Sequence, residues 1–201
     1  MSKKENISCG YVSPIITEER KLNVATMDVF SRLMADRIIF LGTDIDAESA
    51  NTVVAQLLFL DSTAKDNEPI HMYINSPGGS VFDGLAIYDT MKIIKCPVIT
   101  TCVGSCCSMA AVLLAAGEKG KRRIMKHSRV MIHQPSGGCS GTSDDVEIEA
   151  NQLKLCKDTL YTLMSDDIGR PKEQIIKDSQ RDRWFSAEEA LEYGIVDKII
   201  E

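Results

Sequence analysis

The chain has 201 residues, of which 44% are hydrophobic and 26% are charged, and this composition excludes an intrinsically disordered protein. A single globular domain with its own core is the arrangement expected at this length. The formal net charge of −6 argues against a nucleic-acid-binding protein, because contacts to phosphate groups require a basic surface.

The first half of the chain alternates between helical and strand patterns. Amphipathic periodicity predicts helices, and short apolar runs bounded by turn residues predict strands. The expected elements in chain order are a helix over 27–36, a strand over 38–42, a helix over 47–60, a strand over 70–75, a helix over 82–95, a strand over 97–104 and a helix over 109–116.

The second half is expected to continue this alternation. Two short strands, RRIM and RVMIH, precede the Gly- and Ser-rich segment PSGGCSGTSDD, after which Asp144 and Asp145 are placed to cap a long helix. Pro171 is expected to open another helix, and Ser186 a third, with Glu189 at the capping-box position. A final strand is expected in IVDKII. Strands that alternate with helices predict an α/β fold with parallel pairing.

Targeting signals and metal motifs are not evident in the sequence. The segment between Lys95 and Glu118 carries no charge, but Pro97, Gly104 and several hydroxyl side chains interrupt it, so a strand and a helix are expected there instead of a membrane span. The N-terminal sequence MSKKENISCG has no apolar core, so no signal peptide is expected. Seven cysteines without a CxxC pair favour free thiols in a reducing cytoplasm and argue against a zinc site.

Two glycine-rich strand-to-helix junctions, NSPGGS at 75–80 and VGSCCS at 103–108, are the best candidates for a reactive site. Helix N-termini present unpaired N–H groups, and glycines let the backbone approach a ligand oxygen, so the two loops together could form an oxyanion hole. A tight turn without function is the alternative for NSPGGS, which lacks the lysine of a phosphate-binding loop. In GSCCS, Cys106 stands where the G-x-S-x-G motif of α/β-hydrolases has its serine.

A serine nucleophile needs a general base, and the chain has three histidines. His133 is the best candidate because it ends an apolar strand beside a Gly-rich segment, whereas His71 is expected within a strand and His127 in a solvated turn. Cys107 is an alternative nucleophile if a helix N-terminus lowers its pKa, and the other interpretation is a small buried apolar side chain. The acid that orients the base stays open among three residues of the last quarter, Asp178, Asp182 and Asp197.

Taken together, these segments resemble the proteolytic subunits of the Clp protease family. The resemblance covers nearly the whole chain in the same order and rests on the blocks NSPGGS, GLAIYDTM, CVGSCCSMAA, LLAAGEKGKR, RVMIHQP and QRDRWFSAEEALEYGIVDKI. It implies a serine endopeptidase in which Ser108 is the nucleophile, His133 is the base and Asp182 orients the base. It also implies that the main-chain N–H groups of Gly79 and Met109 form the oxyanion hole.

The resemblance further implies the fold and the way in which substrate binds. The implied fold is a crotonase-like α/β spiral of ββα units with a protruding handle over about 134–169, made of a helix and a strand-and-loop part. The catalytic domain would span 21–201, and 1–20 would be an N-terminal segment, either a removable propeptide or an axial loop. An extended substrate peptide would lie like an added strand against Ser80, Val81, Phe82, Gln134, Pro135 and Ser136.

The implied assembly consists of two stacked heptameric rings in the cytoplasm. A hexameric AAA+ unfoldase ATPase would deliver unfolded polypeptides to it. The subunit itself would need no cofactor or metal and would bind no ATP, nucleic acid or membrane.

Departures from the family pattern lie near the implied site. The family usually has alanines at Cys106 and Cys107, glycine at Ala110, and an acidic residue that bridges the rings at Gln180. A low-activity structural paralogue that assembles with an active subunit is one alternative function, and a crotonase-type acyl-CoA enzyme is another. The complete Ser–His–Asp set argues against both, because neither needs it.

Overall fold

The computed structural model describes residues 15–20 and 23–201, with side chains from Met27 onward. Residues 1–14 of the predicted N-terminal segment, including Cys9, lie outside the described residues. The helices and strands are β1 (Ile15–Arg20), β2 (Asn23–Asp28), α1 (Val29–Ala35), β3 (Ile38–Leu41), α2 (Ala47–Thr63), β4 (Ile70–Ser76), α3 (Val81–Ile93), β5 (Val98–Cys107), α4 (Met109–Ala115), β6 (Arg123–Met125), β7 (Arg129–Ile132), α5 (Ser143–Ile168), α6 (Lys172–Asp178), β8 (Arg183–Phe185), α7 (Ala187–Tyr193) and β9 (Lys198–Ile200).

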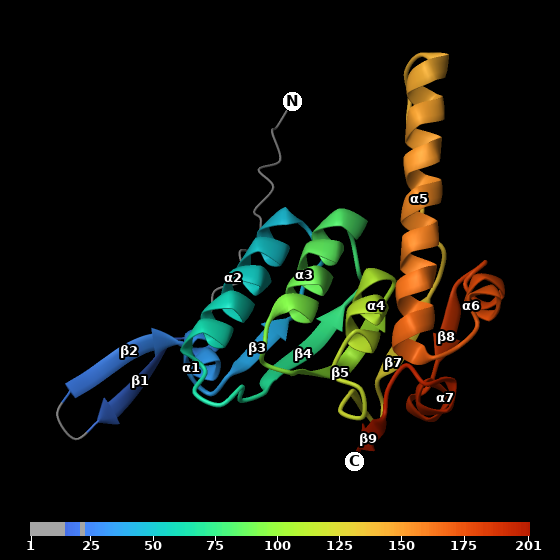
Figure 1. Cartoon of the computed structure of the whole chain (residues 1–201). Coiled ribbons are helices and arrows are strands. Elements are labelled where there is room, and N and C mark those ends of the chain that lie inside the picture. Colours follow the sequence, from blue (N-terminus) through green and yellow to red (C-terminus); the bar gives the residue numbers. More distant parts are fainter. Residues whose placement is uncertain (1–14, 21–22) are drawn as a thin grey trace, which may run out of the picture.

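A seven-stranded sheet forms the centre of the molecule. Its main path runs β3-β4-β5-β6-β9, and β7 pairs with both β5 and β8. Every pair in this sheet is parallel except β7–β8, which confirms the predicted α/β fold with parallel pairing. The remaining strands, β1 and β2, form an antiparallel hairpin that projects from one end of the molecule (Figure 1).

Helices α2, α3 and α4 lie side by side over one face of the sheet (Figure 1). In α2 the buried residues recur at helical spacing, so one stripe of the helix faces the sheet. The residues of this stripe are Ala50, Val53, Leu57 and Leu60. All seven residues of α4 are buried, because this helix lies at the centre of the core. The uncharged segment is therefore the strand and helix that were expected, and no helix within the described residues is long and apolar enough to cross a membrane.

The helix starts agree with the sequence signals at α7 and differ at α5. At α7 the predicted capping box is present, because Ser186 Oγ accepts from Glu189 N while the Glu189 carboxylate accepts from Ser186 N. At α5 the expected caps, Asp144 and Asp145, are wrong, since both already lie in the first helical turn. Thr142 is the N-cap, and Asp145 accepts from the Thr142 N–H and hydroxyl.

Helix α5 extends well beyond the rest of the fold and is the helical part of the predicted handle (Figure 1). Only its C-terminal half packs on the core, where Leu160, Tyr161 and Met164 are buried. The strand part of the handle is absent from the described residues, because residues 133–142 form no strand. An extended segment gains ladder hydrogen bonds only from a neighbouring strand, and the fold offers none beside this segment.

Candidate active site

Ser108 occupies the junction between β5 and α4. Its backbone has φ 54° and ψ −124°, a positive φ that residues with a side chain rarely adopt. The Ser108 N–H donates to the Met131 carbonyl at 2.9 Å, which ties the junction to β7. A strained turn between a strand and a helix is how α/β hydrolases present a nucleophile, although the G-x-S-x-G motif is missing here.

The structure brings Ser108, His133 and Asp182 into one hydrogen-bonded row. His133 Nε2 lies 2.8 Å from Ser108 Oγ, and His133 Nδ1 lies 3.0 Å from Asp182 Oδ1. The three residues come from the start of α4, the end of β7 and the residue before β8. Because β5 and β7 are parallel, their carboxyl ends meet at the same edge of the sheet. This row has the arrangement of a nucleophile, a base and an orienting acid.

The two other aspartates left open by the sequence bond to different partners. Asp178 forms an ion pair with Arg183 and accepts from Gln174 and Tyr193 at 2.7 and 2.8 Å. Burial acts to raise the pKa of Asp178, but these hydrogen bonds and the Arg183 charge outweigh it and lower the pKa below its ordinary value. Asp178 therefore has a structural role, in which it links α6 to β8 and α7.

Asp197 is held by Arg122, whose side chain is nearly buried. Arg122 donates to Asp197 from its main-chain N–H, Nε and Nη2, at 2.9, 2.8 and 2.7 Å. Burial again acts to raise the pKa of the carboxyl, and the bonds from Arg122 outweigh it and lower the pKa. Asp182 is thus the one of the three candidates that the structure places against His133.

The other two histidines do not contact Ser108. His71 lies in β4, where burial, Arg123 and Arg37 lower its pKa. His127 lies in the turn between β6 and β7. Neither is placed to take a proton from a serine in this site.

The NSPGGS turn packs directly against the backbone of Ser108. A Cβ on Gly78, whose φ is 92°, would lie 2.8 Å from Ser108 Cβ and 3.0 Å from Met109 N, so a side chain there would clash with the junction. The close approach of the two glycine-rich loops, which the sequence predicts, therefore depends on the absence of a side chain at Gly78.

Gly79 is held by a parallel bridge to Ile45. Ile45 N donates to Gly78 O, and Ser80 N donates to Ile45 O, both at 2.8 Å. In a parallel bridge the central residue points its own N–H and C=O away from its partner, so the Gly79 N–H is free to face another group. Met109, the first residue of α4, has no intrahelical acceptor for its N–H.

The segments expected to flank substrate follow residues that contact Ser108, since 80–82 comes after the NSPGGS glycines and 134–136 comes after His133. Ser80 caps α3 by accepting from Asp83 N at 3.4 Å, Val81 begins that helix, and Phe82 is 67% exposed. Pro135 and Ser136 lie in the irregular segment after His133.

Gln134 links the flanking segment to two other elements. Its Nε2 donates to the Gln180 carbonyl at 3.1 Å, and its Oε1 accepts from Lys157 Nζ of α5 at 2.9 Å. The contact with Gln180 is made by the main chain, so it does not depend on the side chain at that position. The sequence did not point to Lys157, because a lysine within a long polar helix carries no sign that it contacts Gln134.

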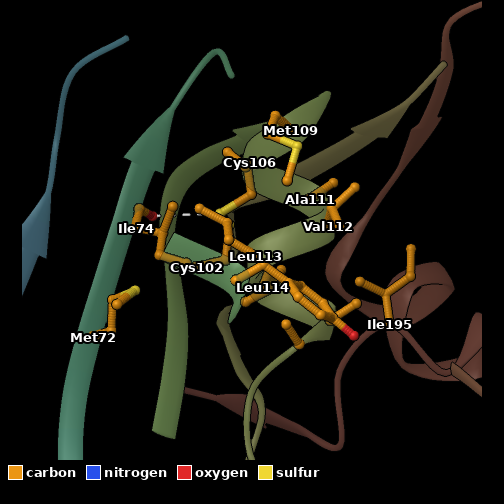
Figure 2. Close-up of a cluster of buried hydrophobic side chains, with 14 of the residues drawn as sticks. Met72, Ile74, Cys102, Cys106, Met109, Ala111, Val112, Leu113, Leu114 and Ile195 are labelled. Carbon is orange, nitrogen blue, oxygen red and sulfur yellow. Dashed lines mark hydrogen bonds between the residues drawn. The ribbon is translucent and has the colours of Figure 1, made fainter. Parts of the chain in front are cut away.

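The cysteines beside Ser108 fill space in the core. Figure 2 shows Cys102 and Cys106 among buried apolar side chains, with Cys106 Sγ donating to the Ile74 carbonyl at 3.5 Å. Burial raises the pKa of the thiols of both Cys106 and Cys107, which keeps them protonated and weakly nucleophilic. Cys107 is therefore a small buried side chain and not an activated thiolate. Within the part of the chain that the structure describes, no cluster of His, Cys, Asp or Glu is arranged to hold a metal ion.

Comparisons with known proteins identify the family. The model of the Clp protease family matches residues 20–201. The chain is 59% identical over 195 residues to the ATP-dependent Clp protease proteolytic subunit of Porphyromonas gingivalis, covering 97% of this chain and 87% of that protein. It is 55% identical over 191 residues to the subunit of the same name from Bacteroides fragilis, covering 95% and 92%. The corresponding figures for the Bacteroides thetaiotaomicron subunit are 54% over 191 residues, 95% and 86%.

Proposed function

The chain belongs to the Clp protease family, and on this premise we propose that Ser108, His133 and Asp182 form its catalytic triad. It is a proteolytic subunit of that family, a serine peptidase that hydrolyses peptide bonds. The observation that carries the residue assignment is the unbroken path from Ser108 Oγ through both ring nitrogens of His133 to Asp182.

In the proposed mechanism, Ser108 Oγ attacks the carbonyl carbon of the scissile bond while its proton passes to His133 Nε2. Asp182 accepts from His133 Nδ1–H, which holds the tautomer that leaves Nε2 free to take the proton. The protonated imidazole then gives that proton to the leaving amine. A water molecule repeats the sequence on the acyl-enzyme, releasing the acid and restoring Ser108.

We place the oxyanion hole at the main-chain N–H groups of Gly79 and Met109. Two observations support this position. The Gly79 N–H points away from its bridge partner, and the Met109 N–H is the first of a helix, where the dipole favours negative charge. An extended peptide would lie between 80–82 and 134–136, with the exposed Phe82 ring favouring apolar side chains.

The assembly that we propose is two stacked heptameric rings joined by the handle. The outer part of α5 has three apolar side chains that are 40–60% exposed: Val146, Ile148 and Leu155. Apolar side chains that protrude on a single helix are expected at a subunit contact. A hexameric AAA+ unfoldase is the proposed partner, which fits the "ATP-dependent" in the relatives' names, and it would deliver unfolded polypeptides in the cytoplasm.

The test is turnover of a short fluorogenic peptide, with an apolar residue before the cleaved bond, by the purified chain assembled alone. Short peptides need no unfolding, so cleavage without ATPase or ATP is the expected result. Rings that form fully, as measured by analytical ultracentrifugation, and yet cleave no such peptide would contradict the proposal and favour a structural subunit.

A further inference from the structure

Strand β5 changes register just before the nucleophile. Ile74 of β4 pairs with Cys102, but Ser76 pairs with Cys106, so two steps along β4 correspond to four along β5. The additional residues form a bulge centred on Gly104, whose φ is 82°. Bulges near active sites re-aim the side chains that follow them, and Ser108 follows this one by four residues.

The same bulge marks the place where β5 exchanges one partner strand for another. Before it, Thr101 and Cys102 pair with β6, and after it Ser105 to Cys107 pair with β7. Strand β7 leads directly to His133. The bulge therefore sets the pairing register between β5, which leads to Ser108, and β7, which leads to His133.

Two polar side chains hold the main chain of the bulge. Asn75 Oδ1 accepts from Ser105 N at 3.1 Å. Ser128 Oγ accepts from Gly104 N at 2.8 Å and donates to Cys102 O at 3.3 Å, so one hydroxyl spans the irregular turn. Ser128 is 3% exposed and directly precedes β7. These bonds occupy backbone groups that the sheet ladder leaves unpaired.

We propose that Asn75 and Ser128 are positioning residues for the reaction, acting through the bulge to place Ser108 against His133. This inference rests on the proposed catalytic role of Ser108. Met131 O accepts from Ser108 N at 2.9 Å and lies two residues before His133. The register of β5 on β7 therefore also decides how Ser108 lies relative to His133. One residue along a strand is about 3.3 Å, more than the 2.8 Å that separates Ser108 Oγ from His133 Nε2.

The test compares paired variants at each position. Asn75 is exposed, so Asn75→Leu removes the acceptor with little effect on the core, whereas Asn75→Asp keeps an acceptor oxygen for Ser105 N–H. Ser128→Ala removes the hydroxyl, and Ser128→Thr keeps it. Since a misplacement of about 1 Å costs about 10²-fold in rate, we expect about a 10-fold loss for Asn75→Leu and about 10² for Ser128→Ala. Asn75→Asp and Ser128→Thr should stay within about threefold of native.

The readout is the rate constant for phosphonylation of Ser108 by a fluorophosphonate, in which an Oγ–P bond forms and fluoride leaves. It is measured on assembled rings at the alkaline plateau, together with the final fraction of chains labelled. A positioning role predicts slower labelling that still reaches completion, with lower kcat and unchanged KM for a peptide. Mere destabilisation would lower the labelled fraction. Ser179→Ala is the matched control, because Ser179 is fully buried and its hydroxyl has no hydrogen-bond partner among the described residues.

Native rates in both Asn75→Leu and Ser128→Ala would overturn the inference. If Ser128→Ala does not assemble, the two Asn75 variants decide alone. Slow labelling of Asn75→Leu together with native-like labelling of Asn75→Asp supports the inference, and equal labelling rates in these two variants overturn it. A native chain that is not labelled at Ser108 contradicts the catalytic assignment itself, so the two failures are distinguishable.

Discussion

Replacing Ser108 by Ala is expected to lower kcat for peptide hydrolysis by about 10⁶-fold, the loss seen when a triad nucleophile is removed. The variant keeps the oxyanion donors and the peptide-binding segments, so KM should change little. Within the described residues the Ser108 hydroxyl bonds to His133 and to no main-chain group, and alanine fits the half-buried position, so rings should assemble normally. The ratio of the two kcat values is measured on Ser108→Ala and native rings that have the same sedimentation coefficient.

Ser62→Ala is the control for loss of a serine hydroxyl. Ser62 is exposed in α2, and within the described residues its hydroxyl bonds only to the Phe59 carbonyl, so native turnover is expected. Ser108→Cys offers a second comparison, because a thiol can still attack a carbonyl. Peptide hydrolysis that survives in Ser108→Ala at more than about 1% of the native rate would mean that another group attacks the peptide.

Replacing Asp182 by Asn is expected to lower kcat by about 10⁴-fold. The amide is the same size as the carboxylate, but its NH₂ group can turn to donate to His133 Nδ1 and so stabilise the tautomer with its proton on Nε2. In that tautomer His133 cannot accept the proton of Ser108. The variant should retain the fold, since the Asp182 side chain is 63% exposed and its hydrogen bond to His133 is the contact that the structure gives it within the described residues.

Asp197→Asn is the contrasting variant, with its main effect on stability. It leaves the Arg122 guanidinium nearly buried without its anion, which is expected to cost about 3–5 kcal/mol of unfolding free energy. Because the folded-state pKa of Asp197 is lowered, the stabilisation is present above the unfolded pKa near 3.9 and lost as pH falls below it. Urea unfolding at pH 7 and pH 3 measures this difference. Loss of turnover in a folded Asp197→Asn ring equal to that of Asp182→Asn would contradict the choice of Asp182.

The fold was largely predictable because its central elements obey simple periodicities. The elements 38–42, 47–60 and 70–75 were expected from apolar runs and helical spacing, and β3, α2 and β4 occupy nearly those residues. Strand β8 was not predicted, because the ion-paired Arg183 and the exposed Trp184 leave no apolar run. The hairpin of β1 and β2 was missed as well, since strands that pair with each other and, within the described residues, with no part of the main sheet need no alternation of apolar and polar residues.

The site was predictable in part from residue chemistry and in part only through resemblance. Chemistry favours His133, because it is a histidine at the end of an apolar strand beside a Gly-rich segment, and the structure has it beside Ser108. Spacing could not choose among Asp178, Asp182 and Asp197, since that choice depends on which of them Arg183 and Arg122 neutralise. The bulge at Gly104 was equally hidden, because its fixing bonds join residues far apart in the sequence.

If Ser108 is the nucleophile, a reagent that traps activated serines must form its covalent adduct at that residue. Assembled rings of the native chain and of Ser108→Ala are treated with a fluorophosphonate, digested and examined by mass spectrometry. One adduct per chain is expected, on the fragment containing Ser108, and none in Ser108→Ala. An adduct on a different residue, or assembled native rings that acquire no adduct, would contradict the assignment of Ser108 as the nucleophile.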